Sequence, residues 1–202
     1  MNLANKLTLL RIILAPVFFV IYLLPRLFPS LFNNNEIHIA YFYWTIPVLW
    51  VIFIVSEITD YLDGLAARKL NQTSDFGKLF DPFADTLVQI TCFLCFIIDG
   101  IFPAWAVILF LLVIYREFSI LFLRNLMLKK GTTLGASIYG KLKTVVYITA
   151  VGAALLAASL ERLAKLESLL PYFKTGALVI FIISVILAVV SFFDYLIQYK
   201  KK

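Results

Sequence analysis

Charged residues are scarce in this chain. Of its 202 residues, 15% are charged and 62% are hydrophobic, whereas charged residues make up roughly 25% of soluble domains. The mean hydropathy is +0.96, and this composition predicts an integral membrane protein. With about 20 residues per span plus connections, the chain has room for six transmembrane helices and no separate soluble domain. We therefore expect residues 1–202 to form a single all-α transmembrane domain.

Cysteine and histidine are nearly absent, which weighs against a zinc or redox site. The two cysteines, Cys92 and Cys95, have the spacing of a redox or metal pair. Both lie inside an apolar run, so we interpret them as small packing residues. His38 is the only histidine, and there is no second cysteine pair to complete a zinc site.

Six apolar runs predict the membrane spans. The first follows a basic start, as in a secretory signal peptide, but no small-x-small cleavage site follows it, so we expect a retained helix. The predicted spans cover residues 12–28, 40–62, 77–98, 104–128, 144–160 and 175–197. The fifth is rich in small residues, which suits close helix packing. The polar segments 30–40, 66–76, 129–143 and 161–174 are predicted to be loops.

Basic residues are distributed unevenly between the two sides of such a bundle. With six spans, both termini lie on one side. That side collects twelve of the 18 lysines and arginines, the opposite side has four, and two, Arg116 and Arg124, fall within a span. By the positive-inside rule, the termini and the loops 66–76 and 129–143 are cytoplasmic. We expect a multi-pass protein of the cell (inner, cytoplasmic) membrane whose site faces the cytoplasm.

Half of the twelve acidic residues gather in one short stretch. The segment 57–85 contains six acids and three bases, a formal charge of −3 in a chain of net charge +6. Acids at the ends of apolar runs are costly unless a positive group lies among them, and a divalent cation is the simplest candidate. The six acids are Glu57, Asp60, Asp63, Asp75, Asp81 and Asp85.

The spacing of four aspartates supports a cation site. Asp60 and Asp63 are three residues apart and Asp81 and Asp85 four apart, so each pair shares one face of a helix. Two pairs on neighbouring helices can converge. Carboxylate oxygens suit hard cations such as Mg²⁺ or Mn²⁺, which often bind phosphate in their remaining positions. This pattern is typical of phosphoryl-transfer chemistry.

The residues between the aspartates carry a family resemblance. Gly64 lets a ligand approach the helix backbone, and Arg68, one turn further on, suits a diphosphate. Eight positions match the signature D-x2-D-G-x2-A-R-x8-G-x3-D-x3-D, and in these the chain resembles the CDP-alcohol phosphotransferases. The resemblance implies that Asp60, Asp63, Asp81 and Asp85 hold the metal, that Asp85 is the general base, and that Gly64, Ala67, Arg68 and Gly77 shape the CDP site.

The N-terminal segment extends this resemblance. Asn5, Thr8 and Arg11 lie at steps of three residues, and phosphatidylglycerophosphate synthases within the larger family often begin with a similar N-x2-T-x2-R. The pattern has two readings. The three residues form a polar anchor at the membrane interface, or they take a direct part in the site.

Two further patterns bear on the acceptor alcohol. Arg116 and Glu117 lie in the middle of an apolar run, where charges usually mark function, although an internal ion pair or a snorkelling arginine is the alternative. An acceptor such as glycerol 3-phosphate is a dianion that needs cations beyond those holding the diphosphate, and Arg116, Arg124, Lys141 and Lys143 are available. R-E-x6-R and A-S-x2-G-K-x-K-T, at residues 116–124 and 136–144, look like the pattern of phosphatidylglycerophosphate synthases.

Together these resemblances imply transfer of a phosphatidyl group from CDP-diacylglycerol to glycerol 3-phosphate, with CMP released. Membrane lipid is then a partner, a homodimer is implied, and no nucleic-acid partner is expected. Two alternatives remain open. The acceptor could be phosphatidylglycerol or inositol phosphate, as in a cardiolipin synthase or an inositol-phosphate transferase of this family. A divalent-cation transporter would instead distribute its acids through the depth of the membrane.

Overall fold

Six long helices make up most of the described chain. The computed structural model describes residues 3–69, 75–129, 138–163 and 166–200, with side chains described for 5–62, 80–127, 138–163 and 166–200. Each of the six is long and apolar enough to cross a membrane, so the all-α, multi-pass prediction is confirmed. The elements are α1 (Leu3–Leu27), η1 (Pro29–Phe32), α2 (Asn35–Lys69), α3 (Asp75–Asp99), α4 (Ala106–Lys129), α5 (Ile138–Arg162) and α6 (Leu170–Lys200).

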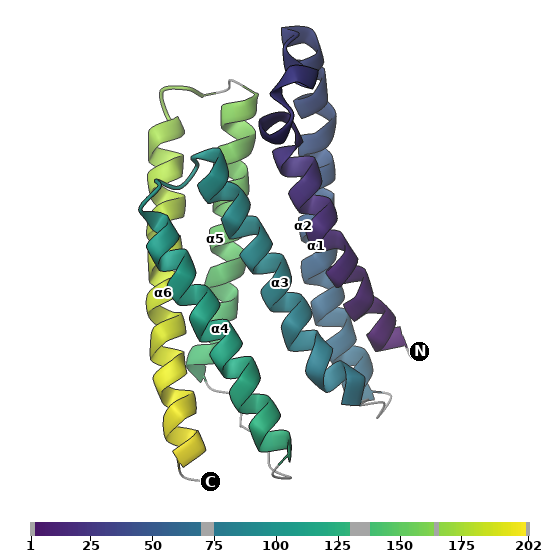
Figure 1. Cartoon of the computed structure of the whole chain (residues 1–202), viewed down its shortest axis with the longest axis vertical. Helices are drawn as coiled ribbons and strands as arrows, with labels where there is room; N and C mark the ends of the chain where they lie inside the picture. Colours follow the sequence, from purple (N-terminus) through teal and green to yellow (C-terminus); the bar gives the residue numbers. More distant parts are fainter. Residues whose placement is uncertain (1–2, 70–74, 130–137, 164–165, 201–202) are drawn as a thin grey trace.

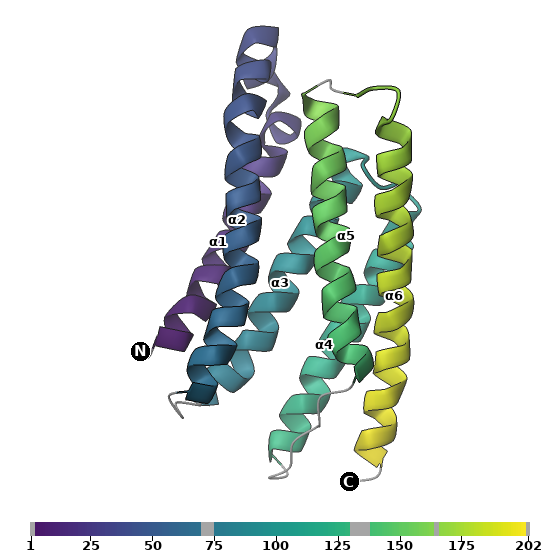
Figure 2. The same ribbon diagram turned by 180° about the vertical axis from the view of Figure 1, so that it is seen from behind.

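The helices form two groups that α3 connects. Helices α1 and α2 lie side by side and run in opposite directions, and α3 packs along α1 before it reaches α4 and α5 (Figures 1 and 2). The starts of α1, α3 and α5 and the ends of α2, α4 and α6 lie toward the same end of the bundle. We call this the motif end. The opposite, far end contains the junctions α1–α2, α3–α4 and α5–α6.

Aromatic and small side chains form the buried core between α3, α5 and α6. The ring of Phe93 lies 4.6 Å from that of Phe181 and 5.5 Å from that of Tyr147, measured between ring centres. Helix α5 buries a series of alanines, and α6, which packs along it, buries Ala177 and Ala188. The expected close packing of the fifth span is therefore confirmed.

The helices are longer than the apolar segments, so the loops predicted from the sequence were too long. Helix α1 begins at residue 3 instead of 12, α2 covers 35–69, α3 begins at 75, α5 at 138 and α6 at 170. Lys141 and Lys143, expected in a loop, therefore lie in the first two turns of α5. Hydropathy marks only the apolar part of a helix, whereas leucine, lysine and arginine continue it readily beyond that part. Asn34 marks the start of α2, because its Oδ1 accepts a hydrogen bond from the Glu36 amide at 2.9 Å.

Candidate active site

Three of the predicted aspartates lie at the motif end of the bundle. Asp60 is in the last third of α2, and Asp81 and Asp85 are one turn apart near the start of α3. All three side chains are partly exposed, whereas Ala84 and Thr86 beside them are buried. Asp60 of α2 and the aspartates of α3 therefore lie at the same end of neighbouring helices.

Helix α1 brings two polar side chains to these aspartates. The Thr8 hydroxyl donates a hydrogen bond to Asp81 Oδ1. Arg11 Nη1 lies 2.7 Å from Asp60 Oδ1 and also donates to Asp85 Oδ1. The Arg11 side chain is only 1% exposed. Of the two readings of the N-terminal pattern, the structure thus favours a direct place in the site for Thr8 and Arg11, and Asn5 on the same helix is buried as well.

The carboxylates are suited to a hard divalent cation. Asp60 and Asp85, from different helices, bind one positively charged group between them, so the fold places oxygen donors around a point where positive charge is favourable. Among the described side chains, no group of three acidic, histidine or cysteine residues surrounds a common point. The Asp63 side chain is not among the described side chains. The four-aspartate metal site therefore stays a prediction.

The residues predicted to shape the CDP site cannot be placed in detail. The backbones of Gly64, Ala67 and Arg68 are in the last turns of α2, and Gly77 is in the first turn of α3. Their side-chain positions lie outside the described part of the structure. Their predicted role therefore stays a prediction.

A cavity of about 280 Å³ lies beside the aspartates. Asp81 and Asp85 line it, and so do all four cations predicted to bind the acceptor phosphate: Arg116, Arg124, Lys141 and Lys143. These cations come from α4 and α5, far from the aspartates in sequence. The structure thus brings two of the four aspartates and all four predicted cations to one cavity.

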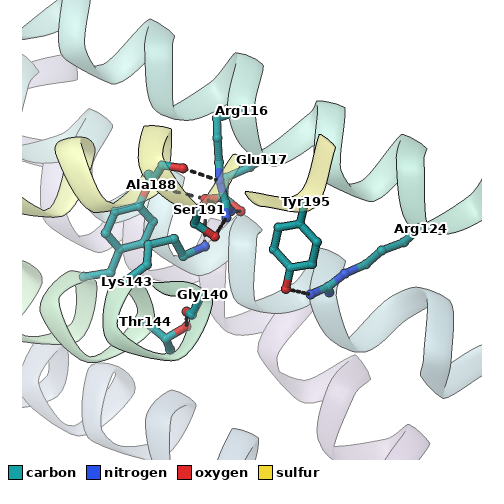
Figure 3. A network of polar contacts seen from close by, with 10 residues as sticks. Arg116, Glu117, Arg124, Gly140, Lys143, Thr144, Ala188, Ser191 and Tyr195 are labelled. Atoms are coloured by element: carbon teal, nitrogen blue, oxygen red, sulfur yellow. Dashed lines mark hydrogen bonds and ion pairs between the residues drawn. The ribbon is translucent and has the colours of Figure 1, made fainter. Parts of the chain in front are cut away.

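Glu117 pairs with two of these cations. Arg116 Nη1 lies 2.8 Å from both carboxylate oxygens of Glu117, and Lys143 Nζ lies 2.8 Å from Oε1 (Figure 3). Tyr147 Oη is 3.4 Å from the same oxygen. All four residues are buried. The internal ion pair considered for the sequence is therefore present.

The arginines are also held by α6. Arg116 Nε donates to the Ala188 carbonyl oxygen at 3.1 Å, and Nη2 donates to Ser191 Oγ at 2.8 Å. All three guanidinium nitrogens of Arg116 therefore have partners in the chain. Arg124 Nη2 donates to Tyr195 Oη at 3.2 Å, and its guanidinium carbon is 5.6 Å from the centre of that ring (Figure 3).

Sequence reasoning missed several residues that line the cavity or hold its arginines. Gln89 is buried and lies four residues after Asp85, so the series 81, 85, 89 was a detectable helical face. Ser191 and Tyr195 of α6 are also four residues apart on one face. In sequence they stand in a run of apolar residues, and their relation to Arg116 and Arg124 depends on the packing of α6 against α4.

Comparisons with known proteins agree with the motif. The model of the family described as CDP-alcohol phosphatidyltransferase matches residues 1–193. The chain is 40% identical to a CDP-diacylglycerol--glycerol-3-phosphate 3-phosphatidyltransferase of Treponema pallidum (strain Nichols), over 97% of this chain and 88% of the relative. It is 38% identical to a Bacillus subtilis (strain 168) protein of the same name, over 77% of both chains. It is 35% identical to a probable phosphatidylglycerophosphate synthase of Mycobacterium tuberculosis, over 75% of this chain and 64% of the relative.

Proposed function

The chain belongs to the CDP-alcohol phosphatidyltransferase family, and from this premise we propose that it transfers a phosphatidyl group from CDP-diacylglycerol to glycerol 3-phosphate. The products are phosphatidylglycerophosphate and CMP. One observation carries the proposal: a single cavity is lined by Asp81 and Asp85 and by the four cations suited to a phosphorylated acceptor. The names of the relatives, which specify the same two substrates, support it.

The site is proposed to lie on the cytoplasmic side of the cell membrane. CDP-diacylglycerol keeps its acyl chains in the bilayer, while the nucleotide comes from the aqueous phase. The excess of lysine and arginine at the motif end supports this orientation, with both termini cytoplasmic. Residues 1–202 act as a single transmembrane domain in this proposal, and the chain works as a homodimer, which chemical cross-linking in membranes tests.

Asp60, Asp63, Asp81 and Asp85 are proposed to hold Mg²⁺ or Mn²⁺. A bound divalent cation neutralises charge on the diphosphate and orients the reacting groups. The all-oxygen donor set of the described carboxylates supports a hard cation. Gly64, Ala67, Arg68 and Gly77 are proposed to accommodate the CDP group next to this site.

The four acceptor cations are proposed to divide into two pairs. Arg116 and Lys143 share Glu117 and lie buried in the wall of the cavity. Lys141 is exposed, and Arg124 is partly exposed with a neutral tyrosine as its partner. Guanidinium and ammonium groups that have no carboxylate partner among the described residues are better suited to bind a dianion. We therefore assign the direct phosphate contacts to Arg124 and Lys141, and to Arg116 and Lys143 the task of shaping the cavity.

Asp85 is proposed to act as the general base. It shares Arg11 with Asp60 of α2, and it lines the cavity. An acceptor hydroxyl transfers its proton to Asp85, and its oxygen forms a bond to the phosphorus that carries diacylglycerol. The bond from that phosphorus to the bridging oxygen breaks, and CMP leaves with that oxygen. Arg124 and Lys141 hold the acceptor phosphate so that the hydroxyl faces the phosphorus.

Incorporation of radiolabelled glycerol 3-phosphate into lipid by purified protein tests the proposal. The assay contains CDP-diacylglycerol and Mg²⁺ or Mn²⁺, and parallel reactions offer phosphatidylglycerol, inositol phosphate and uncharged glycerol. We expect incorporation with glycerol 3-phosphate and release of CMP, and neither with Asp85→Asn. Asp194→Asn, the same change in α6 away from the aspartates, is the control and should stay active.

Other outcomes separate the alternatives. Transfer to a different alcohol would keep the family reaction and overturn the acceptor. A well-folded protein that uses no alcohol, but carries Mg²⁺ or Mn²⁺ into proteoliposomes without nucleotide, would favour the cation transporter. The described aspartates of the motif gather at one end of the bundle, which argues against a path through the membrane.

A further inference from the structure

A second cavity lies at the far end of the bundle. Its volume is about 430 Å³, and it is formed where α1, α3 and α5 end and α2 begins. None of its residues takes part in the proposed transfer reaction, so it needs a separate explanation. Its walls include Tyr22, Arg26, His38, Phe42, Asp99 and Arg162.

Arg162 places a buried guanidinium in the wall of this cavity. Its side chain is 7% exposed, and Nη2 donates to Asp99 Oδ2 and to the Tyr22 carbonyl oxygen, both at 3.0 Å. The guanidinium carbon lies 3.8 Å from the centre of the Tyr22 ring. Nη1 is buried and has no hydrogen-bond acceptor among the described residues. A buried donor without an acceptor is unfavourable, so an acceptor from outside the described residues would complete the site.

The carboxylates near Arg162 already have cationic partners. Asp99 pairs with Arg162, and Arg26 Nη1 lies 3.7 Å from its Oδ1. Glu161 pairs with Lys174 at 2.7 Å. Three cations therefore stand against two carboxylates, and the buried side-chain atom of this cavity that has no hydrogen-bond partner among the described residues, Arg162 Nη1, is a donor. The chemistry of the cavity thus favours an oxyanion over a cation.

The mouth of the cavity is suited to the membrane interface. Arg26 is 57% exposed, and Ile39, which also lines the cavity, is 66% exposed. Phe28 and Leu31, in the neighbouring α1–α2 junction, are exposed as well. A cation beside exposed apolar side chains at the end of membrane-spanning helices lies at the depth of lipid phosphates.

We propose that the far-end cavity binds a phosphate group, with Arg26 and Arg162 as the donors. The phosphate of a lipid headgroup in the adjacent leaflet and free inorganic phosphate share this chemistry. A site on the side of the membrane opposite to the aspartates would let the surrounding lipid or phosphate bind without competing for the substrate cavity.

Calorimetric titration of the purified, delipidated protein in detergent tests the site, with no divalent metal present. The probes are inorganic phosphate, dihexanoyl phosphatidylglycerol and, as a control without phosphate, dihexanoylglycerol. Arg26→Gln removes one donor at an exposed position, so it should fold normally and lower the affinity about tenfold or more, as expected for loss of one charge-assisted hydrogen bond. Arg124→Gln makes the same change in the cavity beside the aspartates. A loss of affinity in this variant would show that the phosphate probe binds in that cavity instead.

The outcomes decide both the site and its ligand. Binding that Arg26→Gln weakens and Arg124→Gln preserves supports the proposal, whether the lipid alone or inorganic phosphate as well is bound, and the comparison of the two probes identifies the source. Arg162→Lys should weaken the same binding if it folds. Equal affinity of the wild type and Arg26→Gln, equal binding of dihexanoylglycerol, or no binding of either phosphate probe would overturn the proposal and leave a water-filled cavity.

Discussion

Lys143 Nζ donates to Glu117 Oε1 at 2.8 Å and so ties the start of α5 to the middle of α4. The same carboxylate accepts both hydrogen bonds from Arg116 Nη1. One buried acid therefore stands between two buried cations. In the R-E-x6-R pattern, Glu117 pairs with its neighbour Arg116 and so supports the cavity wall. The two arginines of the pattern, Arg116 and Arg124, line the cavity.

Replacing Glu117 with glutamine should destabilise the protein. The variant leaves Arg116 and Lys143 buried without their counter-charge, at a cost of about 1–2 kcal/mol in a membrane bundle. We expect the melting temperature in detergent to fall by about 2–8 °C. Glu161→Gln is the matched control, because Glu161 forms a more exposed pair with Lys174, and it should change the melting temperature little. Equal shifts in both variants would contradict a special role for Glu117.

Arg124→Gln and Lys141→Gln should each weaken binding of glycerol 3-phosphate. Loss of one charge-assisted contact to the acceptor phosphate should raise the KM for glycerol 3-phosphate about 10–100-fold. The KM for CDP-diacylglycerol should change by no more than about twofold, because the nucleotide has its own contacts. Steady-state kinetics with each substrate varied in turn measures both values. A rise confined to the KM for CDP-diacylglycerol would instead assign these cations to the nucleotide, and Lys174→Gln at the far end is the control.

How far the sequence could predict this site depends on the range of the interactions. Asp81, Asp85 and Gln89 share a helical face, so local spacing predicted the aspartates and could have predicted Gln89. The contact between Arg11 and Asp60 joins residues 49 positions apart, and it depends on how α1 packs against α2 and α3. The spacing of residues within one helix carries no information on how helices pack. The sequence therefore could not decide whether Arg11 is an interfacial anchor or part of the site.

The helix ends were missed for a different reason. Hydropathy predicted six spans, but helices α2, α5 and α6 begin several residues before the predicted spans. Lys141 and Lys143 were thus predicted as loop residues, although they share α5 with Tyr147. In a helix their side chains are directed differently, and only Lys143 is buried. The different tasks proposed for the two lysines follow from this helical placement.

Removal of divalent metal should abolish the transfer. EDTA should stop CMP release from the purified protein, and added Mg²⁺ or Mn²⁺ should restore it, because the diphosphate charge is otherwise unbalanced. Asp60→Asn and Asp81→Asn should each lower kcat about 100-fold or more, a loss of roughly 3 kcal/mol in transition-state stabilisation. Full activity in EDTA after extensive dialysis would contradict a metal-dependent reaction.

The cysteine pair should be dispensable for the reaction. Cys92 and Cys95 are both buried in the core of α3, and each change to alanine removes only one sulfur atom from packed surroundings. We expect Cys92→Ala and Cys95→Ala to retain activity within about threefold and to lose about 1 kcal/mol or less of stability. Activity and thermal unfolding, with and without dithiothreitol, measure both effects. Loss of activity in a stably folded variant would revive the redox or metal reading.

Arg11→Gln should make the protein depend more strongly on Mg²⁺ for its stability. Arg11 donates to carboxylates of α2 and α3, and without it these negative groups repel each other, so the metal-free melting temperature should fall by several degrees. A bound cation offsets the same charge, so Mg²⁺ should raise the melting temperature of Arg11→Gln more than that of the wild type. Arg11→Lys, which keeps the charge, should lie between them. An equal rise in all three proteins would mean that Arg11 and the metal act on different carboxylates.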